Sequence, residues 1–158
     1  PLMESLVDAI RAAEAFPHIV LVDWSYAEDF LGVLSDVNRS NVAWGGSDYD
    51  YDPMSWNREY VCARDSSSLQ AVIAARVNKF ERAFGKPLIT TETGSGFNVN
   101  NRFYESKLSW FRDILAILNS FDRPVFFWRW EWNSLVLADG LTKNPDVMNI
   151  LQRHLLTG

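Results

Sequence analysis

The sequence predicts an α/β fold built from parallel strand-helix units, and two observations support this prediction. Short runs rich in β-branched and apolar residues alternate with longer segments whose apolar residues recur at helical spacing. The short runs are almost continuously apolar, as in parallel strands that are covered on both faces. Because parallel strands are joined by right-handed crossovers, two architectures fit: half of a (β/α)8 TIM barrel, or a small open doubly wound sheet.

The first part of the chain predicts a helix, a strand, a second helix and a second strand. Residues 3–16 form the first helix, which ends at Pro17, and the strand over residues 18–22 follows it. Residues 27–37 have helical spacing, and the strand over residues 41–44 stops at a pair of glycines. The apolar face of the first helix contains Leu6, Val7, Ile10 and Ala13.

The second part predicts two further strands, each followed by a helix. Its clearest element is a helix that starts at the capping residues Asp65 to Ser68 and ends at Gly85. A second predicted helix has its inward face on Leu108, Phe111, Ile114, Leu115 and Leu118. This second helix covers residues 102–119 and lies between a strand over 88–92 and a strand over 124–130. A last helix begins at the cap Asn144 and ends near residue 156. The order is a helix followed by four strand-helix units.

Size, charge and cysteine content exclude several classes of protein. The 158 residues, 47% of them hydrophobic, suit a single α/β unit with its own core, and a net charge of -5 with scattered basic residues argues against a nucleic-acid partner. The lone Cys62 can form no internal disulfide, and we expect it to be buried. No apolar stretch approaches the roughly 20 residues that span a bilayer, and the N-terminal residues lack a signal pattern, so we expect a soluble chain without a membrane partner.

The residues that follow the strands carry the candidate chemistry, because both architectures place function there. Glu92 ends the strand over 88–92 and is the best candidate for a catalytic residue. Pairing with Arg129 or capping of the next loop would explain it without catalysis. The next strand ends in alternating aromatic and polar residues, from Trp128 to Asn133, which suit the face of a sugar ring.

These motifs resemble the last strands of the barrel in clan A glycoside hydrolases, such as cellulases. Residues 86–94, Lys-Pro-Leu-Ile-Thr-Thr-Glu-Thr-Gly, resemble the seventh strand, which carries the nucleophilic glutamate. Residues 41–53 resemble the sixth strand and its loop, with the family's tyrosine at Tyr49 and Ser47 in place of its histidine. The tryptophan-rich segment resembles the eighth strand. The resemblance implies strands five to eight, the C-terminal half of a larger barrel.

The resemblance also implies roles for individual residues in a retaining hydrolase that acts on a β-linked poly- or oligosaccharide. Glu92 would be the nucleophile and Tyr49 would contact it. The family's acid/base glutamate lies in an Asn-Glu pair, which this sequence lacks, so Glu131 or Asp23 would have to serve as the second carboxylate. No cofactor or metal is implied. The implied substrate-binding residues are Trp128, Trp130, Trp24, Ser47 and Trp44.

Two alternatives remain open at the level of sequence. A half barrel without its acid/base residue would be a non-catalytic carbohydrate-binding or self-associating module, which pairs as a homodimer or with a missing N-terminal half. A nucleotide-binding doubly wound domain is disfavoured, because no glycine-rich phosphate-binding pattern is present. The acidic residues after position 47 have partial calcium-loop spacing, but Pro53 replaces the required glycine, and we expect a solvated loop without metal.

Overall fold

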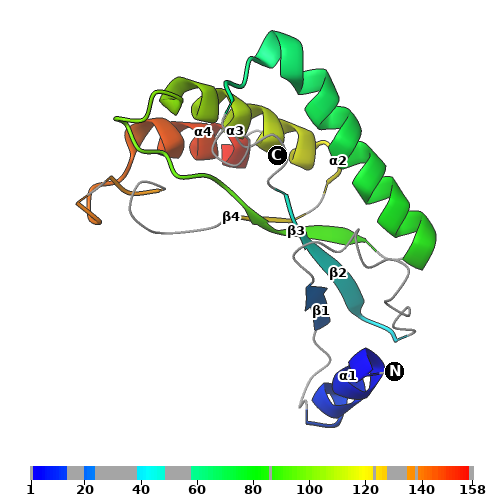
Figure 1. Ribbon diagram of the computed structural model, residues 1–158. Helices are drawn as coiled ribbons and strands as arrows, with labels where there is room; N and C mark the ends of the chain where they lie inside the picture. Colours follow the sequence, from blue (N-terminus) through cyan, green and yellow to red (C-terminus); the bar gives the residue numbers. More distant parts are fainter. Residues whose placement is uncertain are drawn as a thin grey trace.

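The computed structural model describes residues 2–13, 20–23, 39–48, 58–85, 87–122, 124–127, 135–137 and 139–156 (Figure 1). The described residues form helices and strands in alternation after an initial helix. In chain order they are α1 (Leu2–Ala13), β1 (Val20–Asp23), β2 (Val42–Ser47), α2 (Cys62–Phe84), β3 (Leu88–Thr93), α3 (Tyr104–Asn119), β4 (Val125–Phe127) and α4 (Pro145–Leu156). The helix predicted over 27–37 lies outside the described residues.

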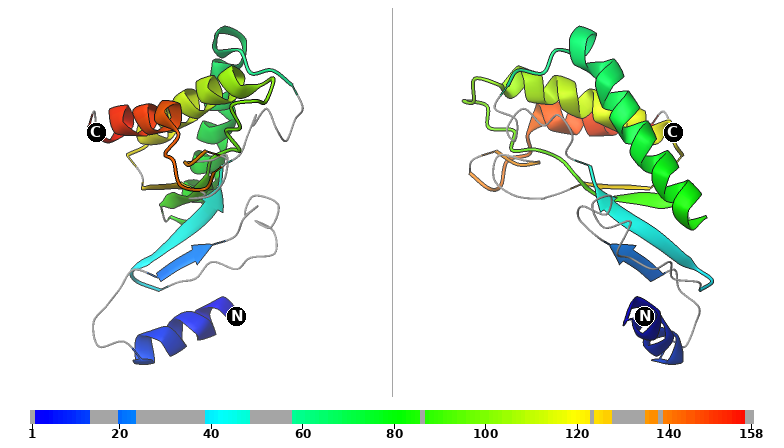
Figure 2. Two further views of the ribbon diagram at one scale, coloured as in Figure 1. Left: turned by 90° about the vertical axis from the view of Figure 1, so that its left-hand side faces the viewer. Right: turned by 45° about the vertical axis from the view of Figure 1, so that its right-hand side comes forward.

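The four described strands form one parallel sheet in the order β1-β2-β3-β4. A doubly wound sheet reverses its strand order at a switch point and carries helices on both faces. Here each strand lies beside the next one in sequence, and α2, α3 and α4 lie over the same face of the sheet (Figures 1 and 2). The predicted α/β fold of parallel strand-helix repeats is confirmed, and the doubly wound alternative is wrong.

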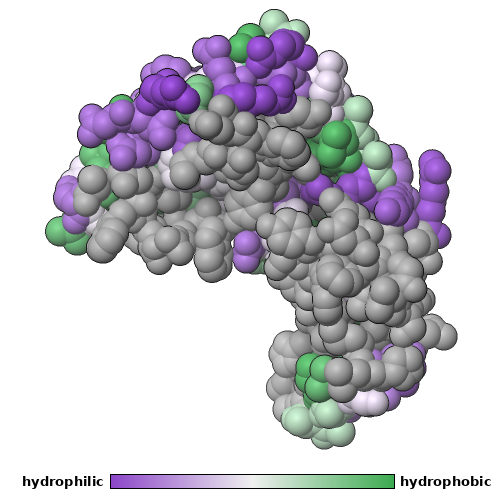
Figure 3. All heavy atoms as spheres, viewed as in Figure 1, coloured by the Kyte–Doolittle hydropathy of each residue, from purple (hydrophilic) through white to green (hydrophobic). Residues whose placement is uncertain are grey.

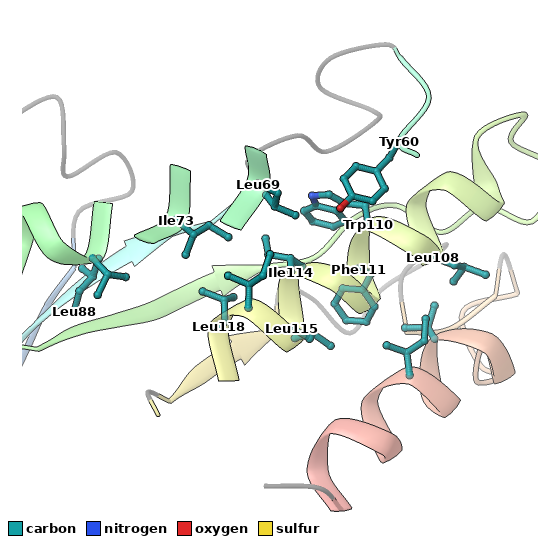
Figure 4. Close-up of a cluster of buried hydrophobic side chains, with 14 of the residues drawn as sticks. Tyr60, Leu69, Ile73, Leu88, Leu108, Trp110, Phe111, Ile114, Leu115 and Leu118 are labelled. Carbon is teal, nitrogen blue, oxygen red and sulfur yellow. The ribbon is translucent and has the colours of Figure 1, made fainter. Parts of the chain in front are cut away.

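The core lies between the sheet and its covering helices (Figure 4). Leu69 and Ile73 of α2 and Ile114 of α3 are fully buried there. All five residues predicted on the inward face of α3 are buried, so that prediction is confirmed. Because each fully buried aliphatic side chain contributes about 1.5–3 kcal/mol, this apolar layer fixes the helices against the strands.

The caps predicted at Gly85 and Asn144 are confirmed, whereas the N-cap predicted at Asp65 to Ser68 is wrong, since α2 begins after Val61 without a side-chain cap. Gly85 adopts the left-handed conformation, with φ of 62°, and its N–H donates to the Glu81 carbonyl, which closes α2. Asn144 caps α4, since its Oδ1 accepts hydrogen bonds from the N–H groups of Asp146 and Val147 at 3.1 and 3.4 Å. These local signals place both helices in the sequence.

Two element boundaries differ from prediction by three residues, the end of β2 because of strand pairing and the start of α2 with a local contact in its first turn. β2 continues through Gly45 to Ser47, since pairing with β1 and β3 on either side holds the glycines extended. α2 begins at Cys62, which is exposed rather than buried as predicted. Asp65 therefore lies inside the first turn, where its carboxylate accepts the N–H of Val61 at 2.8 Å.

The first helix is packed less closely than its apolar spacing predicts. Val7 is 2% exposed, whereas Leu6 and Ile10 are 50% and 44% exposed. α1 lies beyond β1 at the end of the described sheet, away from the layer formed by the other helices (Figure 2). Arg39 fastens it there by donating to both carboxylate oxygens of Asp8, at 2.7 and 2.9 Å.

The outer surface of the helical layer is mainly hydrophilic. Figure 3 shows hydrophilic residues over much of α2 and α3, as expected for helices that bury only their inner faces. Within the described residues, no helix combines the length and apolar character needed to cross a membrane.

Candidate active site

The carboxyl ends of β2 and β3 meet at one edge of the sheet, where Glu92 lies. Ser47 is paired with Glu92 in the sheet register. The N–H of Asp48, the first residue after β2, donates to the Glu92 carbonyl at 2.7 Å. The backbone at Glu92 is thus fixed to the neighbouring strand, as a site at a strand end requires.

β3 contains one extra residue relative to both of its neighbours. On the β2 side, Thr90 pairs with Gly46, but Glu92 pairs with the next residue, Ser47. On the β4 side the register shifts again between Thr90 and Thr93. A β-bulge therefore lies within the segment 90–93, immediately around the candidate catalytic residue.

The bulge determines which face of the sheet Glu92 occupies. Leu88 and Thr90 are buried beneath the helices, and regular alternation would place Glu92 on the same face. With one extra residue in the strand, Thr93 takes that place and is fully buried. Glu92, which is only partly buried, is thereby assigned to the face that α2 and α3 do not cover.

A buried polar cluster supports this edge from the helix side. Asp48 is 3% exposed, and its carboxylate accepts hydrogen bonds from Arg76 of α2 and from the Thr90 hydroxyl, the latter at 2.5 Å. The Thr93 hydroxyl donates to the Asp48 carbonyl at 2.8 Å. The expectation of a solvated acidic loop is wrong for Asp48, because the cluster removes it from water.

A buried lysine holds the loop that follows β3. Lys107 of α3 is fully buried, and its Nζ donates to the carbonyl of Gly96 at 2.6 Å. Gly94, two residues after Glu92, has a φ of 150°, a conformation that glycine adopts most readily. The end of β2 is therefore bound to α2 through Arg76, and the loop after β3 is bound to α3 through Lys107.

No protein-family model and no curated protein matches this sequence. Its structure is similar to that of a GH5 xyloglucan-specific endo-β-1,4-glucanase from a metagenomic library, solved in complex with cellotriose. The two superimpose with a TM-score of 0.68 at 19% identity, over 96% of this chain and 48% of that one. The shared feature is the fold. This chain spans about half the length of the glucanase, whose fold is a TIM barrel.

The structure also places some of the other predicted site residues. Trp44 is fully buried in the core under the helices, so the prediction that it binds substrate is corrected: it has no exposed surface on which a sugar can stack. The Ser47 hydroxyl is buried and has no hydrogen-bond partner among the described residues. Asp23 ends β1, where its backbone pairs with Gly45. The predicted residues Tyr49, Trp24, Trp128, Trp130 and Glu131 lie outside the described residues.

The sequence contained an unused signal for two of the supporting residues. Arg76 lies three positions after buried Ile73, and Lys107 lies four positions before buried Phe111, so both share the apolar face of a helix. A charged side chain on such a face needs a buried partner, which here lies at the end of β2 or after β3. Helical spacing therefore identifies charged residues that support the site.

Proposed function

We propose that this chain is the C-terminal half of a retaining glycoside hydrolase that acts on a β-linked poly- or oligosaccharide, with Glu92 as nucleophile. The observation that supports the proposal is the bulge in β3, from which we infer that the Glu92 carboxylate lies on the face that α2 and α3 do not cover. That position is at the carboxyl end of a strand, the edge used for catalysis in TIM barrels. The fold shared with the GH5 glucanase supports the same assignment.

In this mechanism Glu92 attacks the anomeric carbon and forms a covalent glycosyl-enzyme, while a second carboxyl group protonates the departing oxygen. Water then releases the sugar, and the second group acts as the base. Tyr49 directly follows Asp48, whose N–H binds the Glu92 carbonyl, so the proposed tyrosine contact starts from an adjacent strand end. Trp128 and Trp130 follow β4, the neighbour of β3, and would stack on the sugar.

The second carboxylate must lie about 5 to 5.5 Å from the nucleophile in a retaining enzyme. Glu131 follows β4, which lies directly beside β3. Asp23 ends β1, two strands from β3, and a strand spacing of about 4.8 Å puts the backbones roughly 10 Å apart. Within this chain Glu131 is therefore the preferred candidate. A glutamate in an N-terminal half is the source implied by the family resemblance.

Closure of a barrel requires strands beside both β1 and β4, which form the edges of the described sheet. We propose that an N-terminal half of the same protein supplies them. A homodimer of half barrels is the other arrangement that pairs both edges. Both arrangements enclose the face to which Glu92 is assigned.

The test compares Glu92→Gln with a matched control, Glu105→Gln, in the complete natural protein. Glu105 is an exposed glutamate at the start of α3. We expect Glu92→Gln to lower kcat on a soluble β-glucan or xyloglucan by at least about 1000-fold, because the nucleophile is lost. The control should retain parental activity.

Binding measurements separate the proposal from the alternative of a non-catalytic module. Calorimetry with cello-oligosaccharides should show that Glu92→Gln still binds, since glutamine retains the shape of the side chain. Parental turnover by Glu92→Gln would reject Glu92 as nucleophile. Sugar binding by a parent protein that cleaves no β-glycan would instead favour the binding module.

A further inference from the structure

We infer that Asp48 is a positioning residue that holds the bulged end of β3 and so sets the direction of the Glu92 carboxylate. The inference rests on the proposed role of Glu92 as nucleophile. Asp48 follows β2 directly, and its carboxylate belongs to the buried cluster on the helix side of the sheet. It therefore acts on Glu92 through the backbone and takes no part in the reaction itself.

Asp48 contacts β3 on both sides of the extra residue. Before the bulge, its carboxylate accepts the hydroxyl of Thr90 at 2.5 Å. Beyond the bulge, its carbonyl accepts the hydroxyl of Thr93 at 2.8 Å, and its N–H donates to the Glu92 carbonyl at 2.7 Å. In a regular strand, residues three apart point to opposite faces, whereas here both Thr90 and Thr93 are buried and donate to Asp48, as the extra residue between them allows.

The ion pair with Arg76 gives Asp48 a fixed point of attachment. The side chains of Asp48 and Arg76 are 5% and 10% exposed, and Arg76 comes from α2, which the apolar core fixes against the sheet. A carboxylate has enough acceptor positions to bind the guanidinium and the Thr90 hydroxyl together. Hydrogen bonds in such a buried pair are charge-assisted, so Asp48 binds its partners more strongly than a neutral side chain would.

Loss of the hydrogen bonds between Asp48 and β3 should affect the position of the Glu92 carboxylate more than its chemical reactivity. The bulge interrupts the regular hydrogen-bond ladder of β3, and a return to regular alternation would turn Glu92 towards the covered face beside Leu88. A displacement of about 1 Å in a catalytic group can cost about 100-fold in rate. The expected signature is therefore a lower kcat with little change in KM.

The test uses Asp48→Asn, Thr90→Val and Thr93→Val, with Thr91→Val as the matched control. Thr91 lies within the same bulge, but its buried hydroxyl has no hydrogen-bond partner among the described residues. All four substitutions nearly preserve side-chain volume. The readouts in the complete natural protein are kcat, KM and hydrogen exchange of the Asp48 amide, which reports the bond to the Glu92 carbonyl without any substrate.

We expect Asp48→Asn to accelerate exchange of its amide at least about tenfold and to lower kcat about 10- to 100-fold, with KM within about twofold of the parent. Each threonine variant should shift the same readouts in the same direction by a smaller factor. Thr91→Val should match the parent. Thermal unfolding recorded in parallel shows whether kcat falls at temperatures where each variant remains folded.

Three results would overturn the inference. Exchange and kcat in Asp48→Asn that match those of Thr91→Val would show that Asp48 does not hold the bulge. Faster exchange with unchanged kcat would show that it holds the strand without positioning Glu92. A parent protein without glycosidase activity rejects the proposed function separately, and it also removes the positioning role, whatever the exchange rates are.

Discussion

The carboxylate of Asp65 should contribute measurably to stability through the first turn of α2. Arg64 donates to both of its oxygens, at 2.9 and 2.7 Å, and the Val61 N–H donates to Oδ2 at 2.8 Å. The hydrogen bonds from Arg64, together with that from Val61, lower the pKa of Asp65 from 3.8 to about 2. Substitution by asparagine keeps an acceptor for Val61 but removes the charge.

The size of this effect follows from the two pKa values. At about 1.4 kcal/mol for each unit of pKa shift, the difference between 3.8 and about 2 corresponds to at most about 2.5 kcal/mol at neutral pH. The Arg64 side chain is 56% exposed, so solvent screens the pair, and we expect Asp65→Asn to lose about 1–2 kcal/mol. Because the folded-state pKa is depressed, this stability is present above about pH 4 and is lost as the pH falls towards 2.

Urea unfolding followed by tryptophan fluorescence at pH 7, 3 and 2 measures this contribution. The difference between parent and Asp65→Asn should fall to about half of its neutral value or less at pH 3 and to about a sixth or less at pH 2. The nearby exposed Glu59→Gln serves as control and should remain within about 0.5 kcal/mol of the parent at pH 7. A difference that does not change between pH 7 and pH 2 would refute the assigned pKa of Asp65.

Two further substitutions test the caps that end α2 and begin α4. Gly85→Ala should lower the free energy of unfolding by about 1 kcal/mol, because φ is 62° at this position, and Gly85→Asn should lower it by less. No atom lies within 4 Å of the added Cβ, so the cost is conformational rather than steric. Equal stability of the alanine variant and the parent would contradict this reason. Asn144→Ala should lower the free energy of unfolding by about 1 kcal/mol, because it removes the helix cap, while the Tyr104 hydroxyl keeps its shorter hydrogen bond to Asp146 at 2.7 Å. Asn144→Ser should recover part of the loss, and an unchanged melting temperature would contradict the capping role.

The four described helices and their alternation with strands along the chain were predictable because their signals are local. Apolar spacing identified the buried face of α3, and Gly85 and Asn144 marked the helix ends through their own backbone chemistry. The position of Glu92 at a strand end followed from the same reasoning, since parallel strands place their carboxyl ends on one edge. The helix faces, helix ends and strand ends are each read from residues that lie close together in the sequence.

The bulge and the residues that hold it were not predictable, because they depend on pairing between strands. The segment Leu-Ile-Thr-Thr-Glu-Thr gives no local sign that one residue is extra; only the registers of both neighbouring strands reveal it. The burial of Trp44 likewise depends on which face of β2 the helices cover. The exposure of Leu6 and Ile10 depends on where α1 lies relative to the sheet.

The sequential strand order also has a consequence for how the chain acquires its structure at the ribosome. From β2 onward, each described strand pairs with the described strand synthesised just before it. Each pairing closes over a single crossover rather than over several, which costs less chain entropy than pairing with a more distant strand. We expect β1 and β2, and then β3, to assemble as they emerge during translation. The bulge around Glu92 would then form when β3 pairs with β2, before α3 and β4 have left the exit tunnel.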